Sequence, residues 1–444
     1  MDEAELAESG AGQRAEAEPG GAEPPPGAAG AVRRALAVIG PGFVTGASDD
    51  DPSGIGTYAS VGASLGFGAL WLAPATLPLM AAVQVVCARI GLVTGMGLAG
   101  VLRRSYPRWV LYPAVGTLLV ANTINAGVDI GAIAAGIHLL VPVPVGAMIA
   151  PVGLGIVALQ VWGSYRLIER TFKWLTLALL AYIGSAFFAR PDWGAVLRGT
   201  LVPTVSADPA FLTALVAVLG TTISPYLFFW QASTEVEEAA AGRPEAEPRP
   251  EATDAQLRAA AWDVDLGMVF SNVVMYFIIL ATAATLHASG QTTVATATEA
   301  AQALEPLAGR GAEALLALGL VGSGLLAVPV LTGASAYAVA EARGWRHSLS
   351  ERPRDAKPFY AVIVGSTLLG MLVNVVGIDP ITALYWTAVL NGLLAPPLLA
   401  LVMLMANNRA VMGARTNDRV LNVLGWAATA AMALAAVGLL LSLR

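Results

Sequence analysis

Eleven long apolar segments dominate this sequence, and each is long enough to cross a bilayer as a helix. The chain is 56% hydrophobic and only 13% charged, which excludes an ordinary soluble globular protein. Lipid offers the backbone no hydrogen-bond partner, so spans of this kind must be helical. We therefore predict an all-α polytopic membrane protein. The expected segments are 36–63, 68–94, 110–140, 145–163, 172–189, 211–233, 262–287, 312–342, 358–377, 380–405 and 420–443.

The distribution of Lys and Arg predicts the orientation. With the N-terminus inside, all but four of the 25 Lys and Arg residues fall on the inner side. The exceptions are Arg190, Arg198, Arg310 and Arg444. Cytoplasmic loops of membrane proteins carry such an excess. We expect a multi-pass protein of the cell inner (plasma) membrane with a cytoplasmic N-terminus and an extracytoplasmic C-terminus.

Two polar stretches hold most of the acidic excess behind the net charge of -6. Residues 1–31 are rich in Ala, Glu, Gly and Pro and lack the regions of a signal peptide, so they predict a disordered cytoplasmic tail. Residues 235–260 predict a polar loop. Cys87 is the only cysteine, which excludes an intrachain disulfide and a thiolate cluster.

Three aspartates, Asp49, Asp50 and Asp51, lie inside the first segment and precede Pro52-Ser53-Gly54. At ~1.5 Å per helical residue they lie roughly 20 Å into the segment, near the middle of a bilayer about 30 Å thick. A carboxylate there costs about a few kcal/mol or more unless something pairs with it. Pro-Ser-Gly interrupts the helix and releases backbone carbonyls. Acids beside free carbonyls predict a cation site, with Asp51 as the central ligand.

Successive helical residues point ~100° apart, so the three aspartates cannot all face one ion. Two alternatives remain. The run lines an aqueous vestibule, or one member keeps a proton because neighbouring like charges disfavour ionisation.

The sixth segment is interrupted in a related way, at Gly220-Thr221-Thr222-Ile223-Ser224-Pro225. Ser224 would offer a hydroxyl, and Thr221 and Thr222 their carbonyls. The alternative is a proline kink whose backbone is satisfied by its own Ser and Thr side chains. Breaks in spans one and six are expected of two inverted five-helix repeats, 36–189 and 211–405, with a site between the broken helices and 420–443 as an added helix.

Asn122, Asn125 and Asp129 share one face of the third segment, because their spacing is three and then four residues. Such a stripe lines a pathway or holds helices together. Asn391 in the tenth segment is as consistent with bridging helices as with binding an ion. The complete set of expected metal ligands is Asp49, Asp50, Asp51, Ser48, Ser53, Gly54, Thr221, Ser224 and Asn391, with Asp129, Asn125 and Tyr226 expected along the pathway.

The nucleotide-like pattern Gly95-Met96-Gly97-Leu98-Ala99-Gly100 follows a membrane helix rather than a strand, so it predicts no dinucleotide site. The three histidines are not at metal-ligand spacing, and no nucleophile is paired with a base. We expect neither an enzyme, nor a resident cofactor, nor a nucleic-acid partner. The partners expected from these residues are a cation and the lipid bilayer.

Several motifs together resemble the Nramp (natural resistance-associated macrophage protein) family of divalent-metal transporters, from about residue 36 onward. They are Gly40-Pro41-Gly42 with the first-span Asp-Pro, Ala88-Arg89-Ile90-Gly91-Leu92-Val93-Thr94-Gly95, Leu304-Glu305-Pro306-Leu307, Thr332-Gly333, Pro397-Leu398-Leu399 and Ala410-Val411-Met412-Gly413. The resemblance implies a LeuT-like fold with inverted repeats, a divalent metal cation as substrate, and transport by alternating access.

Departures from the family pattern bear on the substrate. The family's Asp-Pro-Gly-Asn motif is Asp51-Pro52-Ser53-Gly54 here, and its Met-Pro-His motif is Ser224-Pro225-Tyr226. The thioether and the histidine linked to proton movement are therefore absent. The third-span acid pair is reduced to Asp129. The chain is thus similar to a divergent branch, the Nramp-related magnesium transporters.

An all-oxygen site suits hard ions such as Mg²⁺ or Mn²⁺ better than soft ones. We expect transport of such ions, with proton coupling in doubt. The main alternative is a sodium-coupled transporter of a small, amino-acid-like solute with the same fold, in which helix N-termini would bind a carboxylate. Three aspartates would repel that anion. A metal sensor without transport is a further alternative.

Overall fold

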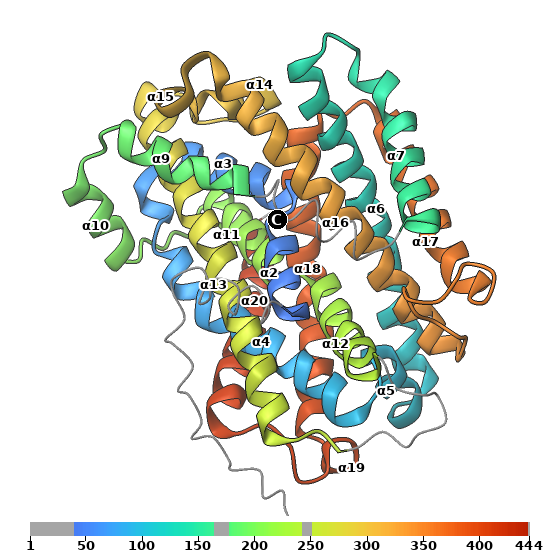
Figure 1. Cartoon of the computed structure of the whole chain (residues 1–444). Coiled ribbons are helices and arrows are strands. Elements are labelled where there is room, and N and C mark those ends of the chain that lie inside the picture. Colours follow the sequence, from blue (N-terminus) through green and yellow to red (C-terminus); the bar gives the residue numbers. More distant parts are fainter. Residues whose placement is uncertain (1–39, 164–176, 242–250, 443–444) are drawn as a thin grey trace, which may run out of the picture. The chain divides into compact units, whose positions relative to one another are not determined.

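The computed structural model describes residues 40–163, 177–241 and 251–442, and this part of the chain is built of helices without a strand (Figure 1). The principal helices are α2 (Pro41–Asp49), α3 (Pro52–Leu65), α4 (Leu72–Thr94), α5 (Leu98–Ser105), α6 (Arg108–Leu140), α7 (Val145–Trp162), α9 (Ala181–Phe188), α10 (Trp193–Leu201), α11 (Pro209–Thr222), α12 (Pro225–Ala240), α13 (Asp254–Thr285), α16 (Ala312–Arg343), α17 (Lys357–Met371), α18 (Pro380–Asn407) and α20 (Arg419–Ser442). Short helices α14 (Ala297–Gln302), α15 (Glu305–Ala308) and α19 (Arg409–Met412) lie in the connections.

Among the described residues, nine helical segments are long and apolar enough to cross a membrane. Nine of the predicted segments correspond to them. The first predicted segment is the interrupted pair α2 and α3, and the fifth is represented by a shorter apolar helix, Ala178–Phe188, with its start outside the described residues. The predicted tail 1–31 also lies outside them.

The predicted loop 235–260 is shorter in the structure. Helix α12 continues to Ala240 and α13 begins at Asp254, where Thr253 and Gln256 form a reciprocal capping box. The Glu/Ala-rich composition that suggested a loop is equally compatible with a helix end, because Ala and Glu are good helix formers. The remaining linker, 242–250, lies outside the described residues.

Two spans are broken where the sequence predicts breaks. Helix α2 ends at Asp49 and α3 begins at Pro52 (Figure 1). Helix α11 ends at Thr222 and α12 begins at Pro225. In both spans the proline is the first residue of the second half, a position where its missing N–H costs nothing. Each break therefore leaves helix-end carbonyls and a helix N-terminus inside the protein.

Helix α2 lies directly on the backbone of α13. A Cβ atom at Gly46 would overlap the carbonyl group of Gly267, so only glycine permits this approach. Asp263 of α13 also caps the start of α2, because its carboxylate oxygens accept hydrogen bonds from Gly40 N at 2.9 Å and Gly42 N at 2.6 Å. These contacts fix the half-helix that carries the aspartates.

The other half-helices are held by separate neighbours. Helix α11 packs along α18, and α12 packs on α4 and α16. The Thr45 hydroxyl of α2 donates to the Gln231 side chain of α12, which joins the first half of one broken span to the second half of the other. Helix α6, which carries Asp129, packs along α16.

Candidate functional site

Asp51 closes the break in the first span. It is the N-cap of α3, and its Oδ1 accepts hydrogen bonds from Gly54 N at 2.6 Å and Ser53 Oγ at 2.7 Å. Such a cap satisfies an otherwise unpaired N–H of the helix end. Ser53 and Gly54, both predicted metal ligands, therefore donate hydrogen bonds to the Asp51 carboxylate in this structure. The second carboxylate oxygen, Oδ2, takes no part in this cap.

Tyr226, at the start of α12, brings the two breaks together. Its hydroxyl lies 3.2 Å from Asp51 Oδ2 and 3.0 Å from the carbonyl oxygen of Ser48. A phenol has one hydrogen, so it donates to one of these acceptors at a time. Close by, a Cβ atom at Gly54 would lie 3.4 Å from Thr221 Oγ1, which shows that α3 and α11 also meet here.

Asp49 and Asp50 face a different neighbour. The Ser271 hydroxyl of α13 lies 2.7 Å from Asp49 Oδ2 and 3.2 Å from Asp50 Oδ1. Within the described part of the chain, the other oxygen of each carboxylate is buried and accepts no hydrogen bond. The three aspartates are thus divided between α12 and α13, as the helical step predicts. Buried oxygens without donors are sites where a cation or water would be stabilised.

Ser224 satisfies much of its own helix break. Its hydroxyl lies 2.7 Å from the carbonyl oxygens of both Gly220 and Thr221. The Thr222 hydroxyl likewise donates to Val218 O. This geometry is that of the proline-kink alternative, in which side chains replace missing backbone donors. The lone pairs of Ser224 Oγ are still available to a cation, because the hydroxyl acts as donor in these contacts.

Asp129 is the second deep acid of the site. It lies on α6 and interacts electrostatically with Asp51, the N-cap of α3. Both of its carboxylate oxygens are buried, and neither has a hydrogen-bond partner among the described residues. It therefore differs from Asp51, whose carboxylate has local donors.

The asparagines of the predicted polar stripe meet different helices. Asn125 and Asn391 bond each other reciprocally, with Nδ2–Oδ1 distances of 2.9 and 3.2 Å, which joins α6 to α18. Asn122 donates instead to the Leu331 carbonyl and the Ser335 hydroxyl of α16, both at 3.1 Å. This geometry is that expected of asparagines that hold helices together.

Every predicted site residue is buried in this conformation. Asp49, Asp50 and Asp129 are 0% exposed and Asp51 is 1% exposed, so the acids are closed off from solvent. Among the described residues, no three side chains of His, Cys, Asp and Glu converge as a metal site. A cation here would depend on one or two carboxylates together with carbonyl and hydroxyl oxygens.

The sequence alone does not predict the contacts of Ser271 and Gln231 with the first broken span. A single Ser in an apolar helix is ordinary, since its hydroxyl can bond its own backbone. The available signal in α13 is a group of polar residues in a largely apolar span: Asp263, Asp265, Ser271 and Asn272. Two of these, Asp263 and Ser271, contact the first broken span.

Comparison with known proteins identifies the family. A family model described as natural resistance-associated macrophage protein-like (Nramp) matches residues 42–442. A protein named divalent metal cation transporter MntH from Klebsiella pneumoniae (strain 342) is 28% identical over 396 residues, covering 88% of this chain and 90% of its own. The MntH of a second Klebsiella pneumoniae strain is 27% identical over 400 residues, covering 89% and 91%.

Two solved structures show the fold. A mutant of the manganese transporter of Eremococcus coleocola has a TM-score of 0.72 at 17% identity and covers 94% of this chain and 88% of its own. Mhp1, a nucleobase-cation-symport-1 family transporter in a closed conformation, has a TM-score of 0.55 at 15% identity and covers 91% and 92%. The predicted LeuT-like, all-α fold is confirmed.

Proposed function

The chain belongs to the Nramp family, and from this premise we propose that it moves divalent metal cations across a membrane by alternating access. It is a multi-pass membrane protein of a family of transporters rather than enzymes. We also propose an inner-membrane location and a cytoplasmic N-terminus, which the Lys and Arg distribution supports. The paired breaks support two inverted repeats.

The observation that carries the proposal is the meeting of the two breaks at Asp51. Asp51 Oδ2 and the Ser48 carbonyl oxygen lie within 3.2 Å of one hydroxyl, that of Tyr226. A cation that displaced this hydroxyl would meet one anionic and one neutral oxygen at once. Asp129, which interacts electrostatically with Asp51, would add a second negative charge. Carboxylates and carbonyls are the ligands that hard divalent cations prefer.

We further propose Mg²⁺ or Mn²⁺ as the substrate and transport without proton coupling. The named side chains around Asp51 contribute oxygen only, because Ser224 and Tyr226 stand at the break of the sixth span. Thioether ligands would favour softer metals. A histidine, the residue that titrates near neutral pH, is missing from this position. Asp49 and Asp50 would strengthen the negative field from the side of Ser271.

The test is uptake into proteoliposomes that contain a magnesium-sensitive dye, with internal pH recorded in parallel. Mg²⁺, Mn²⁺ and Cd²⁺ are added outside in turn. Entry of Mg²⁺ and Mn²⁺ without acidification is the expected result. Entry of Cd²⁺ or Mn²⁺ with acidification, and none of Mg²⁺, would overturn the hard-ion, uncoupled proposal.

Asp51→Asn tests the site itself. The amide keeps the size of the side chain and can still accept a bond from Gly54 N, but the charge is lost. We expect metal binding to weaken by roughly tenfold to a hundredfold, the usual range for a charge-assisted contact. Asp192→Asn is the matched control, because Asp192 caps α10 in an exposed position. Normal uptake by Asp51→Asn would remove Asp51 from the site.

A further inference from the structure

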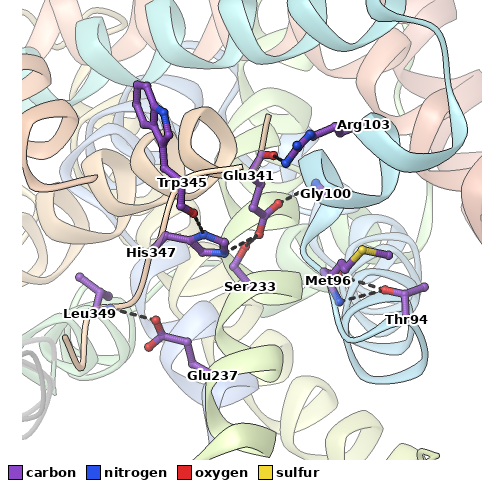
Figure 2. A network of polar contacts seen from close by, with 10 residues as sticks. All are labelled: Thr94, Met96, Gly100, Arg103, Ser233, Glu237, Glu341, Trp345, His347 and Leu349. Atoms are coloured by element: carbon purple, nitrogen blue, oxygen red, sulfur yellow. Dashed lines mark hydrogen bonds and ion pairs between the residues drawn. The ribbon is translucent and has the colours of Figure 1, made fainter. Parts of the chain in front are cut away.

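A buried carboxylate of α16 contacts α12 at the end far from Tyr226, and the metal site does not account for it. Glu341, near the end of α16, is only 6% exposed. Figure 2 shows it at the centre of a network, with Ser233 of α12, Gly100 of α5 and His347 around it. Burial of a carboxylate is costly, and hydrogen-bond donors offset that cost.

Three elements donate to or approach this carboxylate. Oε2 accepts from Gly100 N at 2.9 Å, and Oε1 accepts from the Ser233 hydroxyl at 3.2 Å. His347 Nε2 lies 3.8 Å from Oε1. Glu341 thus ties α12 to both α16 and α5.

A second contact holds the same part of α12. One turn beyond Ser233, the Glu237 carboxylate accepts from Leu349 N at 2.8 Å (Figure 2). Leu349 belongs to the segment that follows α16. Two contacts four residues apart, on one side of the helix, therefore fix the end of α12 to α16 and its continuation.

The opposite end of α12 contacts the metal site. Tyr226 lies in the first turn and reaches Asp51, while Ser233 follows two turns later, roughly 10 Å along the axis. Between them, Gln231 bonds Thr45 of α2. A continuous helix transmits a displacement of one end to the other, because its backbone hydrogen bonds resist bending.

The surroundings of Glu341 also allow its hydrogen bond with Ser233 to break. A cavity of about 520 Å³ lies beside the carboxylate, lined in part by Arg103, Arg104 and Trp345. Water in such a space would hydrate Glu341 once Ser233 moved away. The contact can therefore alternate between a closed, hydrogen-bonded arrangement and an open, hydrated one.

We propose that Glu341 is a positioning residue for transport: it holds α12 closed against α16 and thereby keeps Tyr226 on Asp51. This role in transport rests on the proposed function. The contact lies at the end of the molecule that the Lys and Arg distribution assigns to the cytoplasm. Loss of the Glu341 contact is then a required step when the site opens to that side.

The test measures opening without any metal, so its result is independent of which ion is carried. Thr45→Cys, in a Cys87→Ala background, places a single reactive thiol at a fully buried position of α2. A membrane-impermeant maleimide is added to inside-out vesicles, and the labelling rate is measured. Glu341→Gln should be labelled roughly tenfold faster, as expected for loss of a charge-assisted hydrogen bond. Glu341→Asp should restore part of the slow rate.

Glu313→Gln is the matched control, because Glu313 is an exposed acid in the first turn of the same helix. A labelling rate for Glu341→Gln within about twofold of the parent would overturn the proposal, as would an equal increase in the control. Should Glu341→Gln fail to fold, Ser233→Ala removes one donor alone and should still speed labelling. An unchanged rate in Ser233→Ala would then overturn it.

Transport gives a second readout that a purely structural role would not produce. A shift of the population towards the state open to the cytoplasm should raise the apparent KM for external Mg²⁺, because a smaller fraction of the protein is then competent to bind from outside. The maximal rate should change less. A fall in maximal rate with KM unchanged would contradict the positioning role.

Discussion

The phenol oxygen of Tyr226 lies 3.2 Å from Oδ2 of Asp51, so the second half of one broken span contacts the acid that caps the second half of the other. Pro52 and Pro225 start these two halves, and the residue immediately before each proline marks the break. The contact joins positions 175 residues apart. The Tyr226 hydroxyl thus occupies the position at which a divalent cation would contact both Asp51 Oδ2 and the Ser48 carbonyl oxygen.

Tyr226→Phe should therefore tighten metal binding. The change removes one oxygen and leaves the ring, so the cation no longer has to displace a hydrogen bond of about 1 kcal/mol, or roughly fivefold in affinity. Calorimetric titration of the purified protein with Mn²⁺ checks this. Tyr182→Phe is a matched control, because Tyr182 is a buried tyrosine on α9. Weaker binding in Tyr226→Phe would show that the hydroxyl is itself a ligand.

Ser224→Met should shift the preference towards softer metals. It introduces a thioether at the break and removes the hydroxyl that occupies the Thr221 carbonyl. The measurement is the ratio of Cd²⁺ to Mg²⁺ uptake, which we expect to rise about tenfold. Thr213→Met is the control, since Thr213 makes the same kind of bond to a backbone carbonyl earlier in α11. An unchanged ratio would place Ser224 outside the cation's contacts.

Ser271→Ala should destabilise the metal-free protein more than the metal-loaded one. It deprives Asp49 and Asp50 of their shared donor, and leaving buried acceptors unsatisfied costs about 1–3 kcal/mol. A bound cation would stabilise the same Asp49 and Asp50 carboxylates and so reduce this loss. Thermal unfolding in detergent, with chelator and with excess Mn²⁺, measures the difference. In Ser60→Ala, whose hydroxyl bonds only its own helix, the loss should be small and independent of metal.

We expect the Asn125–Asn391 pair to hold α6 and α18 together rather than to line the cation pathway. Each single change to Ala leaves the partner amide buried and unpaired, whereas the double change removes both groups. The double mutant should therefore lose less stability than the sum of the single mutants, by about 1 kcal/mol. Unfolding by denaturant measures this coupling. Additive stability losses, together with a lowered metal affinity in each single mutant, would instead favour a role in the pathway.

The sequence allows the broken helices to be predicted because their causes are local. Asp51-Pro52 and Ser224-Pro225 each combine a polar residue with a proline in an apolar span, and neither can continue a regular helix. The separate environments of the three aspartates also follow from the helical step. Both features depend only on neighbouring residues.

Side-chain contacts between helices that are distant in the sequence depend on how the helices pack, and the sequence alone does not predict them. Ser271 reaches Asp49 only because α2 lies on α13, and an isolated Ser in an apolar helix does not indicate that contact. Asn122 and Asn125 share one side of α6, yet they bond to different helices, α16 and α18. Glu341, at the end of a span, has the pattern of an ordinary solvated charge, although the structure buries it.

The glycine contact between α2 and α13 bears on how fast the site can open. Gly46 meets the backbone of Gly267 with no side chain between them. Interlocked side chains must change rotamer before two helices part, and each such change adds to the activation barrier. Bare backbone surfaces have no rotamers to rearrange. At this contact, separation of α2 from α13 is resisted by polar bonds, those from Gly40 and Gly42 to Asp263 and that from Ser271 to Asp49, and we expect opening to require that these few bonds break.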